Sequence, residues 1–180
     1  MTKERKQFEQ IFRIVASDPN AWLEQAQEMK LAAEPILQRF LEVIDESQSR
    51  PGIRLKKLAY VHAYMLLTGF AFENLLKAIA VDRGLITLNK TNLRGLSRQM
   101  GGHSLTELAC RLNLQLTSEE RNYLERLEEF TYWAGRYPVS RRLGDYADSH
   151  SAGRLSFVTT DPEMSDRLFD RLSKLINNPT

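Results

Sequence analysis

The stretch Leu58–Val81, LAYVHAYMLLTGFAFENLLKAIAV, is the most apolar segment of the chain and decides the fold. Its only acidic or basic side chains, apart from one histidine, are Glu73 and Lys77. Apolar side chains surround a helix built from this stretch, as in a helix that contacts neighbours on several sides. Glu73 and Lys77 stand four positions apart with the acid first, the favourable order for an ion pair. We therefore predict a buried central helix.

A run this apolar also has to be considered as a membrane span. Every window of about eighteen residues within it contains a charged side chain, and Glu73, Asn74 and Lys77 all fall inside the candidate span. We therefore interpret the stretch as the core helix of a protein that does not contact a membrane.

Length and composition are typical of one globular domain. The chain has 180 residues, of which 42% are hydrophobic and 27% charged. Cys110 is the single cysteine, which excludes an intramolecular disulfide, and the opening MTKERKQF lacks the apolar run of a signal peptide. We expect a single helical domain over residues 1–180, located in the cytoplasm.

Helical spacing predicts two helices before the central one. The first covers residues 2–16 and the second residues 21–47, where Pro35 is expected to kink or split the helix. The central helix then covers residues 53–83 and ends at Gly84. Because only a short turn joins the second helix to the central one, we expect these two to lie antiparallel, as in helical bundles.

Two capping boxes mark helix starts after the central helix. Ser104 and Glu107 have the spacing in which the serine accepts a hydrogen bond from a backbone amide while the acid reaches back to the serine's own amide. Thr117 and Glu120 repeat this pattern and open a longer helix that ends at Gly135. Both starts are predicted from local chemistry alone.

The segments between these helices show no helical periodicity. Residues 85–102 mix isolated apolar side chains with Gly, Asn and Thr, which predicts a loop containing one helical turn. Residues 136–160 have no sustained periodicity, which predicts a long loop. The alternation typical of a strand occurs there only over 154–159. A loop of that length is uncommon unless it is functional or disordered. Asp161 followed by Pro162 marks the start of the last helix.

Together these elements predict an all-α fold. We expect an antiparallel helical bundle with an N-terminal helical extension over residues 1–50. A long loop and the C-terminal helix should occupy residues 143–180. The sequence contains no internal repeat that would divide the chain into units.

Positive charge gathers in the connections although the net charge is only +2. Residues 83–103 contain four basic side chains and no acid, and residues 136–160 contain four basic and two acidic side chains. The helical region between them, residues 104–135, has three basic and six acidic side chains. Because loops often carry function, the two basic connections indicate a partner surface, whereas the alternative is that they are only solvated.

Most catalytic and metal-binding motifs are absent from the sequence. It has no Gly-rich phosphate loop that ends in Lys-Ser or Lys-Thr, no Glu-x-x-His for a di-iron site and no Gly-x-Ser-x-Gly elbow. One cysteine and three scattered histidines disfavour a zinc site. Ser104 beside His103 is better explained as a helix cap than as a nucleophile. We predict neither a metal nor a cofactor.

Four pieces in a fixed order resemble a known family. They are Phe72–Ala78 on the central helix, His103–Leu108 at the next helix start, the Glu-rich helix 118–135, and Arg136–Pro138 at its end. Their order and spacing are similar to those of the HEPN superfamily. Members often show an acid and a Lys-Ala on the second bundle helix, a His-Asp-Leu-like helix start and an Arg-Tyr-Pro. Ser104 stands where Asp is common there, which keeps the capping chemistry.

The resemblance covers about residues 55–142 and implies a helical, usually dimeric domain concerned with RNA or nucleotides. Some members of the family are metal-independent endoribonucleases, and others are partners of a nucleotidyltransferase. The resemblance therefore implies a homodimer, RNA or a nucleotide as ligand, and a nucleotidyltransferase as a candidate partner protein. It also implies a place in a bacterial toxin–antitoxin or defence-type system.

Nuclease members of the family share an Arg followed, after four to six residues, by a His, and the pairs of two subunits can form one composite site. Arg136 stands at the position of that Arg, but residues 141–143, where the His would follow, are two arginines and a leucine. Arg98 and His103 do have the spacing, in a loop before a helix start. We take Arg136 and His103 as the candidate catalytic residues.

Metal-free RNA cleavage needs one group to take the proton of the ribose 2′-OH and another to protonate the leaving oxygen, and histidine suits both tasks. Arg136 can hold a phosphate with two parallel hydrogen bonds, or cap the carbonyl groups at the end of helix 118–135. Tyr137 can stack on a base or pack in the core. His62 is expected to pack in the core, whereas His150 can approach a ligand from the long loop.

Two hypotheses from different classes follow, with a purely structural or subunit role as a third. The first is a noncatalytic module that binds RNA, a nucleotide or a partner protein through its basic loops. The candidate binding residues are Arg94, Arg98, Arg136, Tyr137, Arg141 and Arg142. The second is a ribonuclease that combines Arg136 with His103 or His150. In either case the residues with structural roles are Glu73, Lys77, Ser104 and Glu107.

Overall fold

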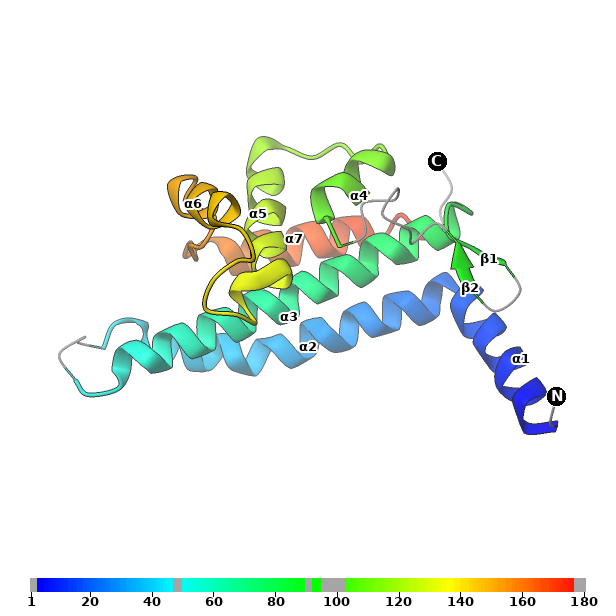
Figure 1. Ribbon diagram of the computed structural model, residues 1–180, viewed down its shortest axis with the longest axis horizontal. Coiled ribbons are helices and arrows are strands. Elements are labelled where there is room, and N and C mark those ends of the chain that lie inside the picture. Colours follow the sequence, from blue (N-terminus) through cyan, green and yellow to red (C-terminus); the bar gives the residue numbers. More distant parts are fainter. Residues whose placement is uncertain (1–2, 47–49, 90–91, 95–102, 177–180) are drawn as a thin grey trace.

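A computed structural model describes residues 3–46, 50–89, 92–94 and 103–176. The described chain is mostly helical, as the all-α prediction requires (Figure 1). In chain order the elements are α1 (Lys3–Ser17), α2 (Pro19–Ile44), α3 (Ile53–Asp82), β1 (Thr87–Asn89), β2 (Asn92–Arg94), α4 (Leu105–Arg111), α5 (Ser118–Glu129), the π-helical turn η2 (Phe130–Ala134), α6 (Leu143–Ser151) and α7 (Asp161–Ser173).

The central helix α3 is the axis around which the other elements pack. α3 runs back along α2 over most of its length, and α4, α5, η2 and α7 lie against its other side (Figure 1). Side chains are buried on the side of α3 that faces α2 and on the side that faces the other helices. This explains why the sequence of α3 is apolar around the whole circumference. The residues of α3 with no exposed surface are Met65, Ala71, Phe72, Leu75, Leu76, Ala78, Ile79 and Ala80.

The length and apolar composition of α3 would also allow it to cross a membrane. Within the described residues it is the one helix of this kind, and 78% of its 18-residue apolar window is buried inside the fold. The core helix of a globular domain has the same properties, so the composition of α3 does not by itself indicate a membrane.

The sequence predicts that Pro35 kinks or splits the second helix; α2 is one continuous helix, so the split is wrong. Ala33 and Phe40, on either side of the proline, are both buried. Packing of both halves into the same core offsets the backbone hydrogen bond that the proline removes. The turn after α2 leads into α3, which ends before Gly84, where a φ of 68° reverses the chain as predicted.

The capping predictions are confirmed for α5 and only in part for α4. Thr117 and Glu120 form both hydrogen bonds of the capping box. Ser104 accepts from the Glu107 amide at 3.2 Å, but the Glu107 carboxylate accepts from Arg111 instead of reaching back to Ser104. Glu128 of α5 also reaches this helix start, although not the Ser104 amide: its Oε2 accepts from the Thr106 amide and from the hydroxyls of Ser104 and Thr106.

The two connections predicted as loops contain regular structure. Residues 87–89 and 92–94 pair as short antiparallel strands in which Leu88 lies opposite Leu93, so the expected helical turn is not found in the described part of that connection. The strands have three residues each, too few to show a period of two. Within 136–160 the nine-residue helix α6 forms, and residues 154–159, considered for a strand, are turn and irregular chain. Ser149 is the fully buried residue of α6, so this helix has no apolar face that its sequence could have revealed.

Glycine permits close contact between α3 and the end of α5. A Cβ atom added at Gly69 would overlap Cγ2 of Thr131 and lie 3.1 Å from the carbonyl oxygen of Leu127. Thr131 cannot easily turn away, because its hydroxyl donates to the carbonyl of Glu128 at 2.9 Å. Gly135 makes a similar approach, since a Cβ added there would lie 3.0 Å from Cβ of Leu66. The two glycines bring the segment before Arg136 onto α3.

The first prediction concerns this contact. Gly69→Ala should lower the free energy of unfolding by about 2 kcal/mol, because the added methyl group overpacks the interface between α3 and η2. Helix propensity alone predicts the opposite sign, a gain of up to ~1 kcal/mol for alanine over glycine. Urea denaturation followed by circular dichroism measures the change. Gly144→Ala in α6 is the matched control, because a Cβ there meets no atom within 4 Å; a stabilised Gly69→Ala variant would contradict the packing described.

Candidate functional site

A buried carboxylate on α3 connects the core to the start of α4. The Glu73 side chain is only 7% exposed, and its Oε1 accepts from Nζ of Lys77 one turn along the helix. The same oxygen bonds Nδ1 of His103 at 2.8 Å. Glu73 and Lys77 therefore form the predicted pair, and His103, thirty positions away in sequence, joins them.

The position of His103 follows from the cap of α4. His103 directly precedes the N-cap Ser104, whose hydroxyl is fixed between the Glu107 amide and the Glu128 carboxylate. An ionised carboxylate only accepts hydrogen bonds, so Nδ1 of His103 carries a hydrogen and is the donor of its hydrogen bond to Glu73. In a neutral imidazole the other nitrogen, Nε2, then keeps its lone pair. The His103 side chain is 76% exposed, so this nitrogen is accessible from solvent.

His103 lines a cavity of about 640 Å³ that also contains Arg136, Tyr137 and Arg141; we call it the His103 cavity. The remaining lining residues are Tyr132, Trp133, Pro138, Val139 and Ser140. The cavity thus joins the start of α4 to the segment that follows η2. Four of the predicted site residues, from two separate parts of the sequence, meet there.

Arg136 caps the end of the helical segment and lines the cavity at the same time. Its Nη2 donates to the carbonyl of Tyr132 at 2.6 Å, which confirms the capping alternative. A guanidinium has five N–H donors, and this bond uses one of them. The guanidinium carbon lies 5.5 Å from the ring centre of Tyr137, whose side chain is exposed, so packing of Tyr137 in the core is wrong. Both side chains can contact a ligand in the His103 cavity.

A second cavity of about 480 Å³ shares Trp133 and residues 136–138 with the first; we call it the His150 cavity. His150 lies on α6, and its Nδ1 donates to the carbonyl of Tyr146 at 2.8 Å. His62 lines the same cavity and is half-buried, so the expectation of a packed core histidine is met only in part. Burial lowers the pKa of His62 below its usual value, which favours the neutral ring near pH 7.

The other predicted binding residues do not meet at these cavities. Arg142 is exposed at the start of α6 and is not among the residues lining either cavity. The side chain of Arg94 and the whole of Arg98 lie outside the described residues. The grouping therefore rests on His103, Arg136, Tyr137 and Arg141.

Sequence reasoning missed the residues that support these side chains. Glu129 accepts from the indole nitrogen of Trp133 at 2.9 Å, and Arg154 approaches its other oxygen at 3.5 Å. Tyr146 lies against His150 with ring centres 4.1 Å apart. The i, i+4 spacing of Tyr146 and His150 is visible in the sequence, but it indicates a shared face only once residues 143–151 are known to be helical.

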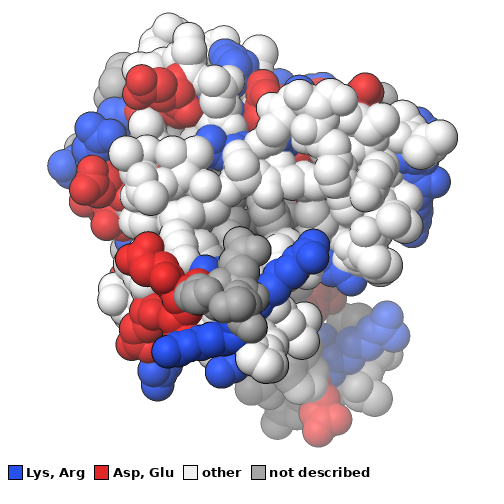
Figure 2. Space-filling model, turned by 90° about the vertical axis from the view of Figure 1, so that its left-hand side faces the viewer, with Lys and Arg blue, Asp and Glu red and all other residues white. Residues whose placement is uncertain are grey.

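Charge is mixed at the end of the molecule where α2 and α3 are joined. Figure 2 shows lysine and arginine side chains next to acidic ones on this face, with broad uncharged areas between them. The face seen there is not a continuous basic surface.

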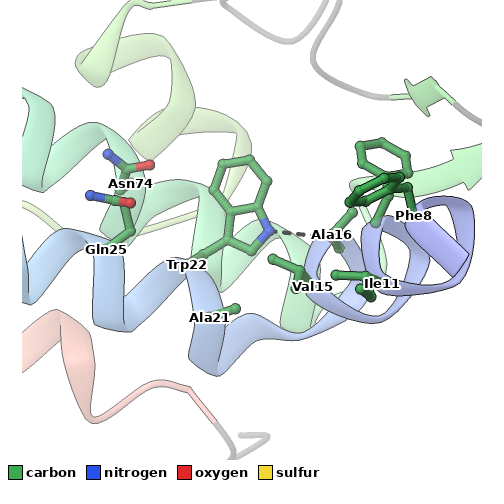
Figure 3. A pocket seen from close by; sticks show the side chains of 9 residues that line it. Phe8, Ile11, Val15, Ala16, Ala21, Trp22, Gln25 and Asn74 are labelled. Atoms are coloured by element: carbon green, nitrogen blue, oxygen red, sulfur yellow. Dashed lines mark hydrogen bonds between the residues drawn. The ribbon is translucent and has the colours of Figure 1, made fainter. Parts of the chain in front are cut away.

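A third cavity is apolar and lies between α1 and α2. Its volume is about 590 Å³, and Phe8, Ile11 and Trp22 are among its lining residues (Figure 3). The indole nitrogen of Trp22 donates to the carbonyl of Ala16 at 3.2 Å, which holds the turn between the two helices. Asn74 and Gln25 are the polar residues of the lining. Nothing in this lining indicates acid–base chemistry.

In the part of the chain that the structure describes, no group of three or more His, Cys, Asp or Glu side chains has the arrangement of a metal site. The groups that the described residues bring to the candidate site are the carboxylate of Glu73, the imidazole of His103 and the guanidinium groups of Arg136 and Arg141.

Comparisons of the chain with protein-family models, with curated proteins and with solved structures found no match. The resemblance to the HEPN superfamily therefore remains a proposal, and the site has to be interpreted from its own geometry.

The second prediction concerns the buried ion pair. Lys77→Met keeps most of the side-chain volume but leaves the Glu73 carboxylate with His103 as its remaining partner. Because breaking a buried pair leaves an uncompensated charge, the free energy of unfolding should fall by about 3 kcal/mol. Chemical denaturation measures the change.

Lys30→Met is the control for this prediction. Lys30 pairs with Asp166, whose side chain is 65% exposed, and loss of an exposed pair costs at most about 1 kcal/mol. Equal effects of the two substitutions would show that the Glu73–Lys77 pair does not stabilise the core.

Proposed function

We propose that this protein is a HEPN-like helical module that binds single-stranded RNA or a nucleotide at the His103 cavity. The observation that carries this proposal is that His103, Arg136, Tyr137 and Arg141 line one cavity. The HEPN-like antiparallel bundle over about residues 55–142 is part of the proposal, as is a place in a bacterial toxin–antitoxin or defence-type system in the cytoplasm, with a nucleotidyltransferase as candidate partner protein.

The chemistry of the lining favours a phosphate that carries a base. Arg136 and Arg141 supply guanidinium groups, which bind phosphate oxygens with paired hydrogen bonds. Tyr137 supplies an exposed aromatic ring beside the Arg136 guanidinium, and aromatic rings bind unstacked bases. A cavity with two cations and an accessible ring therefore suits a nucleotide better than a simple anion.

A metal-independent endoribonuclease is the second candidate, and the contact between Glu73 and His103 favours it. A carboxylate that receives the Nδ1 proton orients the imidazole and leaves Nε2 as a base, as in other acid–base sites. Nε2 of His103 would take the proton of the ribose 2′-OH, whose oxygen then attacks the adjacent phosphorus. The bond from phosphorus to the 5′ oxygen breaks, and the leaving oxygen takes a proton from water. Arg136 would stabilise the charge on the phosphate oxygens.

The third prediction tests the binding that both candidates require. Arg136→Ala should weaken binding of a fluorescently labelled single-stranded RNA about tenfold, because a charge-assisted hydrogen bond is worth ~1.5–3 kcal/mol. Fluorescence anisotropy measures binding, which should also weaken steeply with salt. Arg39→Ala is the control, since Arg39 pairs with Glu42 on α2 and is not among the residues lining the cavity. Arg136→Lys, which keeps the charge near the helix end, tests whether loss of the cap is responsible.

Gel analysis of the same RNA after incubation tests for cleavage. Cleavage that His103→Ala abolishes while binding persists would establish the ribonuclease. Intact RNA with specific binding would establish the noncatalytic module. Absence of binding to RNA and to free nucleotides would contradict the proposed function.

A homodimer is also proposed, and the apolar face of α1 supports it. Phe8, Ile14 and Val15 are more than half exposed, and Ile11 is 49% exposed, so a short helix presents a concentrated apolar surface. The apolar cavity of Figure 3 adjoins this face. Two copies related by a twofold axis would pack the same surface against itself, which removes both patches from water at once.

The fourth prediction tests this surface. Phe8→Glu should convert a dimer into a monomer in size-exclusion chromatography with light scattering, because it places a carboxylate in the apolar contact. Leu55→Glu is the control, since Leu55 is equally exposed on α3 but does not line the cavity of α1. A dimer that Phe8→Glu leaves intact would exclude the α1 surface, and a monomeric parent chain would exclude the homodimer.

A further inference from the structure

The two cavities at residues 136–138 are adjacent but differ in chemistry. Both are lined by Trp133, Arg136, Tyr137 and Pro138. The His103 cavity adds Arg141 and the imidazole that is bound to Glu73. The His150 cavity adds no further Lys, Arg, Asp or Glu side chain, and most of its own lining is aromatic or aliphatic. A ligand that spans residues 136–138 would therefore meet a charged wall on one side and an aromatic wall on the other.

The aromatic wall of the His150 cavity is held in place by hydrogen bonds. The ring of Trp133 is fixed by the bond from its indole nitrogen to Glu129. His150 is fixed by the bond from Nδ1 to the carbonyl of Tyr146. The rings of Trp133 and His150 are inclined by 27° with centres 6.5 Å apart, and Tyr146 contacts both. A flat ligand would meet rings whose orientation is set before it binds.

The polar atoms of this cavity suit a neutral heterocycle. Because Nδ1 of His150 donates to a carbonyl, Nε2 is a hydrogen-bond acceptor in the neutral ring. His62, at the edge of Phe130, is half-buried and supplies a second imidazole. A neutral imidazole both donates and accepts, as does the edge of a nucleobase. An organic cation would fit less well, because Arg136 lines the same cavity and would repel it.

We propose that the His150 cavity is a base-binding site, which takes the unstacked nucleobase of the nucleotide whose phosphate is bound by Arg136 in the His103 cavity. This inference rests on the proposed function and adds to it a second, walled site for the base beside the exposed Tyr137 ring. Arg136 lines both cavities, so a phosphate bound by its guanidinium has the aromatic wall on its other side.

The fifth prediction uses an abasic oligonucleotide. The unmodified protein should bind a short single-stranded RNA about tenfold more tightly than an oligonucleotide of equal length and phosphate number that lacks the bases, because one stacked base contributes ~1–3 kcal/mol. Fluorescence anisotropy with end-labelled oligonucleotides measures both. His150→Ala should remove most of this difference by weakening only the base-containing oligonucleotide. Ser151→Ala, an exposed neighbour on α6 outside the cavity, should leave both affinities unchanged.

A second readout reports on the cavity directly. The chain has two tryptophans, Trp22 near α1 and Trp133 in the cavity wall. In Trp22→Phe the fluorescence of Trp133 should be quenched by the base-containing oligonucleotide and not by the abasic one. If this variant does not fold, the abasic comparison on the unmodified chain still decides.

Three outcomes would overturn the inference. Equal affinity for the two oligonucleotides, without quenching, would exclude a bound base both in the His150 cavity and at Tyr137, while phosphate binding at the His103 cavity would remain. An equal loss for both in His150→Ala would show that His150 does not contact the base. Absence of binding to either oligonucleotide would remove the proposed function and this inference together.

Discussion

The buried carboxylate of Glu73 is the constraint on which the candidate site depends. A carboxylate taken out of water on α3 is stable only if cations or hydrogen-bond donors meet it, and here both donors use the same oxygen. Lys77 comes from the same helix and partly neutralises the carboxylate within the core. His103 comes from the start of α4, so its hydrogen bond to Oε1 of Glu73 also fixes an imidazole at the rim of a cavity. The hydrogen bond that helps to offset the cost of burying Glu73 therefore also determines the position of His103.

The second constraint is the π-helical turn between α5 and the segment that follows. The amide of Gly135 donates to the carbonyl of Phe130, five residues back, at 3.1 Å. The wider turn changes which side chains face α3: Trp133 is buried while Tyr132 points outward. The absence of a side chain at Gly135 lets the turn approach Leu66. Arg136 then follows at a helix end whose carbonyl it caps, with its guanidinium at the wall shared by the two cavities.

Sequence patterns predicted the features that depend on residues close together in the sequence. They did not predict the contacts that depend on segments far apart in the sequence. The central helix, its Glu73–Lys77 pair and the Thr117 capping box follow from spacing alone. The bond between Glu73 and His103 does not, because no pattern in the sequence relates residues thirty positions apart. Glu107 pairs with Arg111 instead of completing the box, and Glu128, from another helix, bonds the start of α4 in a way that the local spacing does not predict. α6 was missed for the same reason, since its described ring contacts are to Trp133 of η2 and it has no apolar face.

The two cavities also explain why a modest net charge is compatible with a phosphate ligand. Long-range attraction from a basic surface is sequence-independent and falls with salt, so a protein that relies on it binds any nucleic acid chain. A cavity with few cations gains less affinity from this long-range attraction and needs additional contacts to the ligand. Rings held by Glu129 and by the Tyr146 carbonyl supply such contacts without further ordering on binding. Under the proposed function, weak steering combined with a preorganised aromatic wall would select for ligands with an accessible base and would disfavour duplexes, whose bases are stacked within the helix.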